Sequence, residues 1–304
     1  MAVGSKVVIE SSLEDLAERL SWYAVLADLI RRKPLGAAGG VIVVIMLIAG
    51  VFAPVFAPFD PVINDYTRPH LAPNLINLLG TDQFGRDILS RIIYGARTAL
   101  LIGFTSSIIG AFTGLILGVA SAYFGGLFDL IFQRIMDVIM AFPLIILALA
   151  MIAVLGPVVQ NDVLLVIFAI TIPFVPRCAR VVRSSALAIR EIPYVDAARA
   201  CGFSHLRIIL RHMTPNVMAP FLIMITAFVG QAILLEASLS YLGLGVQEPI
   251  PAWGLMLQGG AEEYAESAPW IAVFPGLAIT LAVFGFNLFG DALRDTLDPK
   301  LRSQ

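Results

Sequence analysis

The sequence predicts an all-α integral membrane protein with about six transmembrane helices and both termini in the cytoplasm. Of its 304 residues, 59% are hydrophobic and only 14% are charged, and the mean hydropathy is +0.88. Soluble domains carry about 25% charged residues, and a soluble chain this apolar would expose large aggregation-prone patches. The net charge of −2 argues against nucleic-acid binding, and two cysteines are too few for a disulfide framework.

Five stretches are apolar over enough residues to cross a bilayer, which takes about 20. They are 39–57, 99–120, 138–155, 217–235 and 270–290. A sixth, 158–176, is weaker because Pro173 and Pro176 lie near its end, although membrane helices tolerate such prolines when neighbours satisfy the freed carbonyls. In the second stretch, glycines at 110, 114 and 118 share a face, which favours close helix contact; the alternative is that they are merely tolerated.

The basic residues predict the orientation, because cytoplasmic loops are rich in Lys and Arg. Sixteen of the 20 lie on one side of the predicted spans, including seven arginines between 177 and 211, and the other four lie within 68–97. The opposite loop, 241–269, has no basic residue and carries Glu248, Glu262, Glu263 and Glu266. Both termini are therefore expected on the cytoplasmic side.

The predicted spans divide the chain into segments. The N-terminal part has five acidic residues and no apolar core, so no cleavable signal peptide is predicted; residues 11–32 instead predict an amphipathic helix on the inner membrane surface, or a plain cytoplasmic one. The segments are 1–35 (cytoplasmic), 36–57 (first transmembrane helix), 58–98 (outer loop and surface helix), 99–290 (five-helix core, with cytoplasmic loop 177–216) and 291–304 (cytoplasmic tail).

Several kinds of chemistry have no candidate residues. The three histidines fall in predicted loops without metal-ligand spacing, so no metal site is expected. None of the three lysines lies in a G-x-x-x-x-G-K-[ST] phosphate loop, so the chain is not predicted to be an ATPase or another enzyme. Cys178 and Cys201 are expected to be free thiols facing the cytoplasm. The spans are nearly free of charge, whereas ion-coupled carriers place ionisable groups near the midplane.

The inner loop carries the most informative local pattern. Pro193 can open a short helix, with Asp196 in its first turn, where a negative charge suits the helix dipole. Gly202 is placed to end that helix with a positive φ. Ala197 and Ala198 are small enough for another protein to approach the backbone closely.

A second helix is predicted after this glycine. Ser204 can cap it, and it runs to about Met213, with Pro215 stopping it before the next span. From these residues alone, an ordinary basic helical hairpin at the membrane surface is the favoured interpretation.

The loop resembles the E-A-A-x-x-x-G-x9-I-x-L-P signature of inner-membrane subunits of binding-protein-dependent ABC importers. The matching positions are Asp196, Ala197, Ala198, Gly202 and Pro215. The first is Asp rather than Glu, and His212 and Thr214 stand where Ile and Leu are common. The resemblance implies that these five residues couple the chain to an ATPase.

Four further segments resemble the second permease subunit of dipeptide/oligopeptide transporters. They are 80–87 (GTDQFGRD), 240–245 (SYLGLG), 249–256 (PIPAWGLM) and 291–300 (DALRDTLDPK), within a match from about 35 to 302. This resemblance implies a type I ABC importer permease fold in a bacterial inner membrane. It also implies a homologous permease subunit as heterodimer partner, two ATPase subunits that bind ATP and Mg, and an extracytoplasmic substrate-binding protein. No cofactor is expected in this chain.

The cargo remains open at this stage. A peptide is the first expectation, and a nickel chelate, glutathione or a sugar carried by a similar machine is the second. A self-sufficient ion-coupled carrier is a third, less favoured by the lack of midplane charge.

Two outer features are expected to be structural. In 80–97, Asp82 with Arg86 and Asp87 with Arg91 have the i,i+4 spacing of a surface helix that serves as scaffold. Three aromatic residues are expected at the outer membrane interface: Trp253, Tyr264 and Trp270.

Overall fold

The computed structural model describes residues 33–297; the helix predicted over 11–32 lies outside them. The elements are α3 (Pro34–Val51), α4 (Ala53–Phe56), α5 (Ile88–Phe124), α6 (Gly126–Met140), α7 (Leu144–Leu155), α8 (Asp162–Arg190), α9 (Pro193–Ala200), α10 (His205–Ile208), a π-helical turn (Ile209–Met213), a 3₁₀ turn (Thr214–Val217), α11 (Met218–Tyr241), α12 (Trp253–Glu263) and α13 (Trp270–Leu297). Within the described part, extended pairing is limited to one isolated bridge between Thr81 and Asp87.

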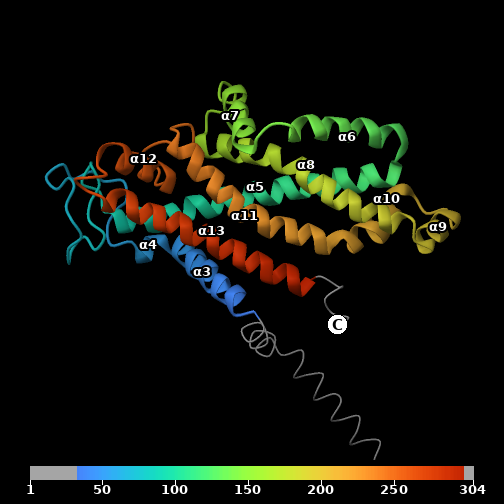
Figure 1. The fold of residues 1–304 in the computed structure, drawn as a ribbon, viewed down its shortest axis with the longest axis horizontal. Helices are drawn as coiled ribbons and strands as arrows, with labels where there is room; N and C mark the ends of the chain where they lie inside the picture. The colour runs from blue at the N-terminus through green and yellow to red at the C-terminus, as the bar shows by residue number, and fades with distance from the viewer. Residues whose placement is uncertain (1–32, 298–304) are drawn as a thin grey trace, which may run out of the picture.

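The predicted helical membrane fold is confirmed. Helices α3, α5, α8 and α13, and the continuous helical run from α10 through α11, are long and apolar enough to cross a bilayer. They lie lengthwise beside one another (Figure 1). Helix α12 and the loop before α5 lie at one end of this bundle, and α9 and α10 lie at the other. The two groups of loops that the charge distribution assigned to opposite sides are therefore at opposite ends.

Close packing of α5 against α8 holds the centre of the bundle. A Cβ on Gly114 would lie 2.6 Å from the Cβ of Cys178, and one on Gly118 would lie 2.5 Å from the carbonyl oxygen of Ala179. The prediction that these glycines allow close approach is confirmed. Cys178 is buried in this contact and its Sγ donates to the carbonyl oxygen of Ala111 at 3.2 Å, so the expectation that it faces the cytoplasm is wrong.

The predicted span over 138–155 is not one helix. Helix α6 ends at Met140 and α7 begins at Leu144, and the two are bent by 96°. Pro143 stands at the break, and a proline disfavours helical conformation in the residue before it. The apolar stretch is therefore a broken pair of helices that lies along one side of the bundle (Figure 1).

Helix α8 is longer than predicted. It passes both Pro173 and Pro176 and ends only at Arg190, so residues 177–190, expected in the inner loop, are helical. Arg177, Arg180 and Arg183 thus belong to a candidate membrane span. The apolar 18 residues that make α8 a candidate span still hold at most two charged residues, and the further arginines lie on the same helix beyond them.

The predicted outer loop 241–269 contains a buried helix, α12. Trp253 at its start is only 2% exposed, and its Nε1 donates to the carbonyl oxygen of Ile92 at 3.0 Å. Trp253 is therefore a core residue, and its predicted interfacial position is wrong. Tyr264 and Trp270 are half-buried and pack against the same apolar core.

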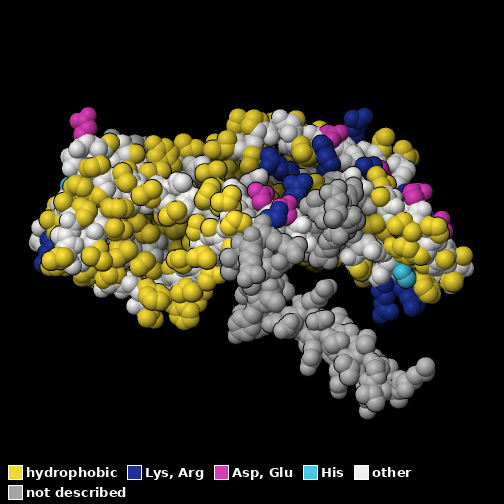
Figure 2. Space-filling model, turned by 60° about the horizontal axis from the view of Figure 1, so that its bottom comes forward, with side chains coloured by type: hydrophobic (Ala, Val, Ile, Leu, Met, Phe, Trp, Pro, Cys, Tyr) yellow, Lys and Arg dark blue, Asp and Glu magenta, His cyan; other side chains and the backbone are white. Residues whose placement is uncertain are grey.

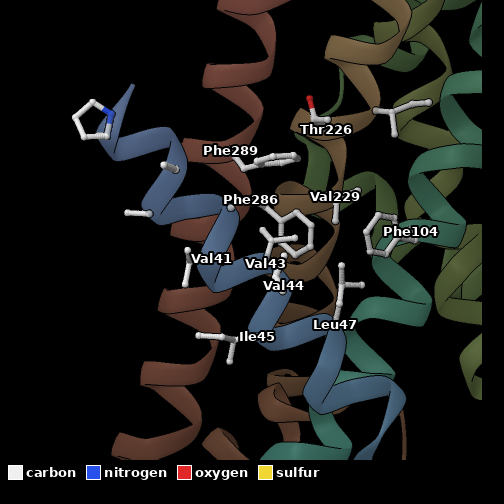
Figure 3. Close-up of a pocket in the computed structure, with 15 residues that line it drawn as sticks. Val41, Val43, Val44, Ile45, Leu47, Phe104, Thr226, Val229, Phe286 and Phe289 are labelled. Atoms are coloured by element: carbon white, nitrogen blue, oxygen red, sulfur yellow. The ribbon is translucent and has the colours of Figure 1, made fainter. Parts of the chain in front are cut away.

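Apolar and charged side chains are distributed unevenly along the surface of the bundle. The face in Figure 2 is mostly apolar over the half of the bundle that ends in α12, and charged side chains gather near its middle and towards the other end. An apolar hollow of about 790 Å³ opens between α3 and the helices behind it, with Val43, Phe104 and Phe286 among its walls (Figure 3). Its walls hold no charged side chain, and the hydroxyl of Thr226 donates to the carbonyl oxygen of Ile223, so the hollow is poorly suited to a polar cargo.

Candidate coupling region and outer ion-pair cluster

The short helix predicted in the inner loop is present as α9. Pro193 is its first residue, and Asp196 lies in its first turn. The φ of Gly202 is +75°, as predicted. The N–H of Phe203 donates to the carbonyl oxygen of Ala198 at 3.1 Å, and the N–H of Gly202 to that of Arg199 at 2.9 Å. These two bonds form a Schellman cap, which requires a residue that tolerates the left-handed conformation.

The chain after this cap differs from the prediction. Ser204 caps α10 through the N–H of Arg207, as expected. The chain then continues through the π-helical turn and the 3₁₀ turn into α11 without leaving a helical path. Pro215 lies in the first part of the 3₁₀ turn, where a missing N–H is harmless. It is part of a joint between α10 and α11 rather than a stop.

The five predicted residues do not form one surface. Asp196 and Ala197 are exposed on α9, and Asp196 pairs with Arg199 at 3.0 Å. Ala198 faces the other way and is buried. Gly202 is exposed, and a Cβ placed there would have no neighbour within 4 Å. Pro215 is exposed further along the chain, at the joint.

Contacts with α5 and α8 fix this region to the bundle. The hydroxyl of Tyr123, at the end of α5, lies 2.7 Å from Nδ1 of His205. The guanidinium of Arg199 lies over the Tyr123 ring, 5.3 Å from its centroid. Nη1 of Arg190 donates to the carbonyl oxygen of Ala122 at 3.0 Å. The end of α5 therefore touches α8, α9 and α10.

Apolar side chains remain exposed beside α9. Leu206 and Leu210 are four residues apart in the helical run, so they share a face, and they are 66% and 56% exposed. Such side chains at the tip of a bundle, together with the exposed small residue Ala197, form a surface that another protein could cover.

At the opposite end, the segment expected to form a surface helix builds an ion-pair cluster instead. Helix α5 begins only at Ile88, and residues 80–87 form a folded loop. Nε of Arg86 lies 2.7 Å from Oδ2 of Asp82, so this predicted pair exists, but inside the loop. Asp87 caps α5 by accepting from the N–H of Ser90 and does not pair with Arg91.

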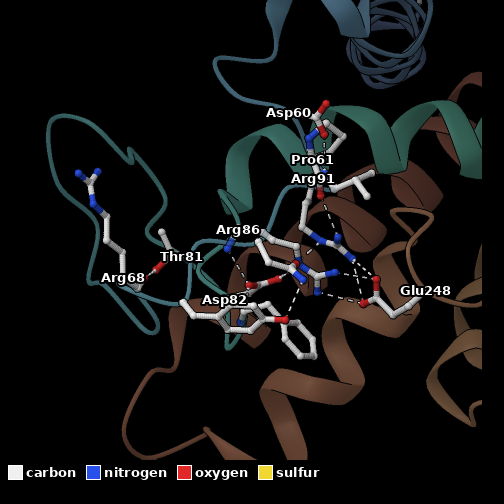
Figure 4. A network of polar contacts seen from close by, with 12 residues as sticks. Asp60, Pro61, Arg68, Thr81, Asp82, Arg86, Arg91 and Glu248 are labelled. Carbon is white, nitrogen blue, oxygen red and sulfur yellow. Dashed lines mark hydrogen bonds and ion pairs between the residues drawn. The ribbon is translucent and has the colours of Figure 1, made fainter.

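Glu248, which the sequence placed only in an acidic loop, completes this cluster (Figure 4). Its carboxylate accepts two hydrogen bonds from Arg86, at 2.7 and 3.0 Å, and one from Nη2 of Arg91 at 3.2 Å. Arg91 also donates to the carbonyl oxygen of Pro61 at 3.0 Å and is fully buried. The cluster thus connects the loop before α5 to the loop before α12.

Contacts within the cluster shift the pKa values of Glu248 and Arg86. Partial burial raises the pKa of the Glu248 carboxyl, but the hydrogen bond from Arg86 and the charges of Arg91 and Arg86 outweigh this effect and hold the pKa below its ordinary value. Burial lowers the pKa of the Arg86 guanidinium, but the hydrogen bond to Glu248 and the charge of Asp82 raise it above the usual range. Both groups are therefore charged near neutral pH.

Comparison with known families bears on both regions. A family model described as "Binding-protein-dependent transport system inner membrane component" matches residues 110–303, which include α9, Gly202 and Glu248. The chain belongs to this family. The N-terminal TM domain of oligopeptide transport permease C matches residues 28–73 of this inner membrane component.

Curated relatives cover nearly the whole inner membrane component. It is 45% identical over 266 residues to a putative peptide transport system permease protein of Brucella abortus, covering 88% of each chain. It is 40% identical to the dipeptide transport system permease protein DppC of Alkalihalophilus pseudofirmus and 42% identical to the glutathione transport system permease protein GsiD of Shigella flexneri, each over 90% of this chain and 88% of the relative.

A solved structure has the same fold. The inward-facing MetNI methionine ABC transporter matches with a TM-score of 0.56 at 19% identity, covering 69% of this chain and 98% of the matched chain. The inner membrane component therefore has the type I ABC importer permease fold, as the sequence predicted.

Proposed function

We propose that this chain is one of two homologous permease subunits of an ATP-driven importer that takes peptides from an extracytoplasmic binding protein. The choice of a peptide as cargo rests on relatives named for peptide and dipeptide transport, which are 40–45% identical over most of the chain. Glutathione is the second candidate, since it is itself a small peptide and a relative named for its transport is 42% identical.

The α9 end supports a contact with one of the two cytoplasmic ATPase subunits of the proposed transporter, which would bind ATP and Mg. Asp196 and Ala197 lie on the exposed side of α9, Gly202 ends that helix, and Pro215 lies in the joint that leads to α11. Ala198 lies on the buried side of α9, where its small side chain allows the helix to pack closely against the bundle. In this proposal the α9 end and both termini are cytoplasmic, and the α12 end faces the binding protein.

Reconstitution tests this proposal. The chain is purified with its partner permease and ATPases in liposomes, and uptake of a labelled dipeptide and of labelled glutathione is measured with the binding protein outside. Dipeptide uptake should require internal ATP, the binding protein and both permeases. Glutathione uptake without dipeptide uptake would show that glutathione, and not a dipeptide, is the cargo. Uptake by this chain alone under an ion gradient would overturn the proposal.

A further inference from the structure

Arg177 of α8 has no ion-pair partner among the described residues 33–297. Arg177 lies midway along the 29-residue helix α8, and its only hydrogen bond among the described residues is to the neutral side chain of Gln231 on α11, at 3.2 Å. The neighbouring arginines differ: Arg180 pairs with Asp137 at 2.5 Å, and Arg183 pairs with Asp129. Arg177 therefore carries an uncompensated positive charge where the flanking helices are apolar.

The Arg177–Gln231 pair lies beside the apolar core between α8 and α11. Arg177 lies one helical turn from Phe174 and Gln231 one turn from Phe228, and these two rings stack with centroids 4.3 Å apart in the core between α8 and α11. Because α8 is a candidate membrane span, a charged side chain on it is expected to face a water-filled cavity or a protein partner rather than lipid.

Two separate hollows lie beside α7 near Arg177. Arg177 lines a small hollow of about 40 Å³ with Pro173 of α8 and with Leu144 and Leu147 of α7. The adjoining residue Ile145 lines a second hollow, of about 360 Å³, together with Leu234 and Ser238 of α11.

A stripe of α11 residues runs from the second hollow to Gln231, the partner of Arg177. Gln231, Leu234 and Ser238 are spaced i, i+3 and i+7, so they share one helix face. Gln231 is exposed, Leu234 is 50% exposed and Ser238 is half-buried. Because α11 ends at Tyr241, this stripe leads from the α12 end of the bundle to Arg177.

We propose that Arg177, held by Gln231, binds the C-terminal carboxylate of a peptide as it passes along the face formed by α7, α8 and α11. A guanidinium binds a carboxylate through two parallel N–H donors, and the apolar hollows accept the peptide's side chains. This proposal rests on the proposed function, because it assigns one group of the peptide cargo to one residue of the pathway.

The carboxylate is tested in the reconstituted transporter with matched peptides whose C-termini are free or amidated. Arg177→Gln should slow import of the free-acid peptide about tenfold, since hydrogen bonds to charged groups contribute about 1.5–3 kcal/mol. It should change import of the amide less than about twofold on the same scale, and Arg177→Lys should retain most acid import. Equal losses for both peptides, or no loss for the acid, would overturn the assignment.

The occupant is identified by photo-crosslinking. Leu234→p-benzoylphenylalanine leaves Arg177 and Gln231 in place, and Phe112→p-benzoylphenylalanine is the control, because Phe112 is 53% exposed on α5, outside this face. During turnover, position 234 should crosslink to labelled peptide and position 112 should not. Crosslinking of position 234 to the partner permease alone would show that Arg177 serves the subunit interface. If the unmodified transporter imports neither peptide, the peptide cargo itself is wrong and this proposal falls with it.

Discussion

The buried guanidinium of Arg91 lies 3.2 Å from the carboxylate of Glu248, 157 residues further along the chain. Arg86 binds the same carboxylate, so one acidic side chain contacts two arginines that are each at most 5% exposed. Asp82 is the other carboxylate in contact with them, 2.7 Å from Arg86 and 3.8 Å from Arg91. The connection between the loop before α5 and the loop before α12 therefore depends on Glu248.

Glu248→Gln should destabilise the protein. The substitution keeps the shape but leaves two buried guanidiniums with one carboxylate, and breaking a fully buried ion pair costs about 3–5 kcal/mol. Because Glu248 is 39% exposed and glutamine can still accept a hydrogen bond, about 1–3 kcal/mol is expected. The measurement is the fraction of monodisperse protein after heating in detergent. Glu266→Gln, at an exposed position, is the control and should leave the midpoint unchanged.

The contribution of Glu248 should depend on pH. Its pKa is lowered in the folded protein, so the stabilisation is complete above the unfolded pKa, about 4.3, and is lost as the pH falls through the lower folded value. The difference in midpoint between the parent and Glu248→Gln should be constant from about pH 7 to pH 5 and shrink below about pH 4.3. A difference that grew on acidification would contradict this assignment.

Gly202→Val should weaken ATPase binding without preventing membrane insertion. At a φ of +75°, a side chain with a Cβ costs about 1–2 kcal/mol, which favours opening of the Schellman cap that sets the end of α9. The measurement is co-purification of the ATPases with the permease pair.

Gly243→Val is the matched control for this substitution. Gly243 also has a positive φ, +73°, and a Cβ there would have no neighbour within 4 Å, but it lies in the turn after α11 at the other end. It should carry the same backbone strain and retain the ATPases. If both variants retained the ATPases equally, α9 would not be part of the proposed interface.

The two cysteines should report topology and burial separately. Cys201 is exposed in the loop after α9, so a membrane-impermeant maleimide should label it only when the cytoplasmic face is open. Cys178 is buried between α5 and α8 and should react only after denaturation. Single-cysteine variants, made by Cys178→Ser or Cys201→Ser, separate the signals. Labelling of Cys201 in intact cells would reverse the proposed orientation.

The sequence predicted best where local rules decide the structure. Five of the six apolar stretches lie in long helices because a membrane helix satisfies its own backbone groups, whatever its neighbours. Helix α9 and its cap follow from Pro193, Gly202 and Ser204, which act within one or two turns of themselves.

Long-range partners account for the predictions that failed. The spacing of Asp82, Arg86 and Arg91 suits a surface helix, and only the contact with distant Glu248 explains why these residues are buried in a loop. Arginines in α8 looked like the start of a loop because the acidic residues of α6 that neutralise two of them cannot be paired from sequence. The break at Pro143 was visible in the sequence, but the apolar length of 138–155 outweighed it.

Helix α5 makes the two ends of the molecule mechanically dependent on each other. Its 37 residues extend about 55 Å at 1.5 Å per residue, well beyond the roughly 30 Å of a bilayer's apolar core. Its first turn holds Arg91 and its last turn holds Tyr123, which touches His205. A tilt of this single unbroken helix would move both loops together. In the proposed transporter, the binding protein at one end and the ATPase at the other would therefore act on the same helix.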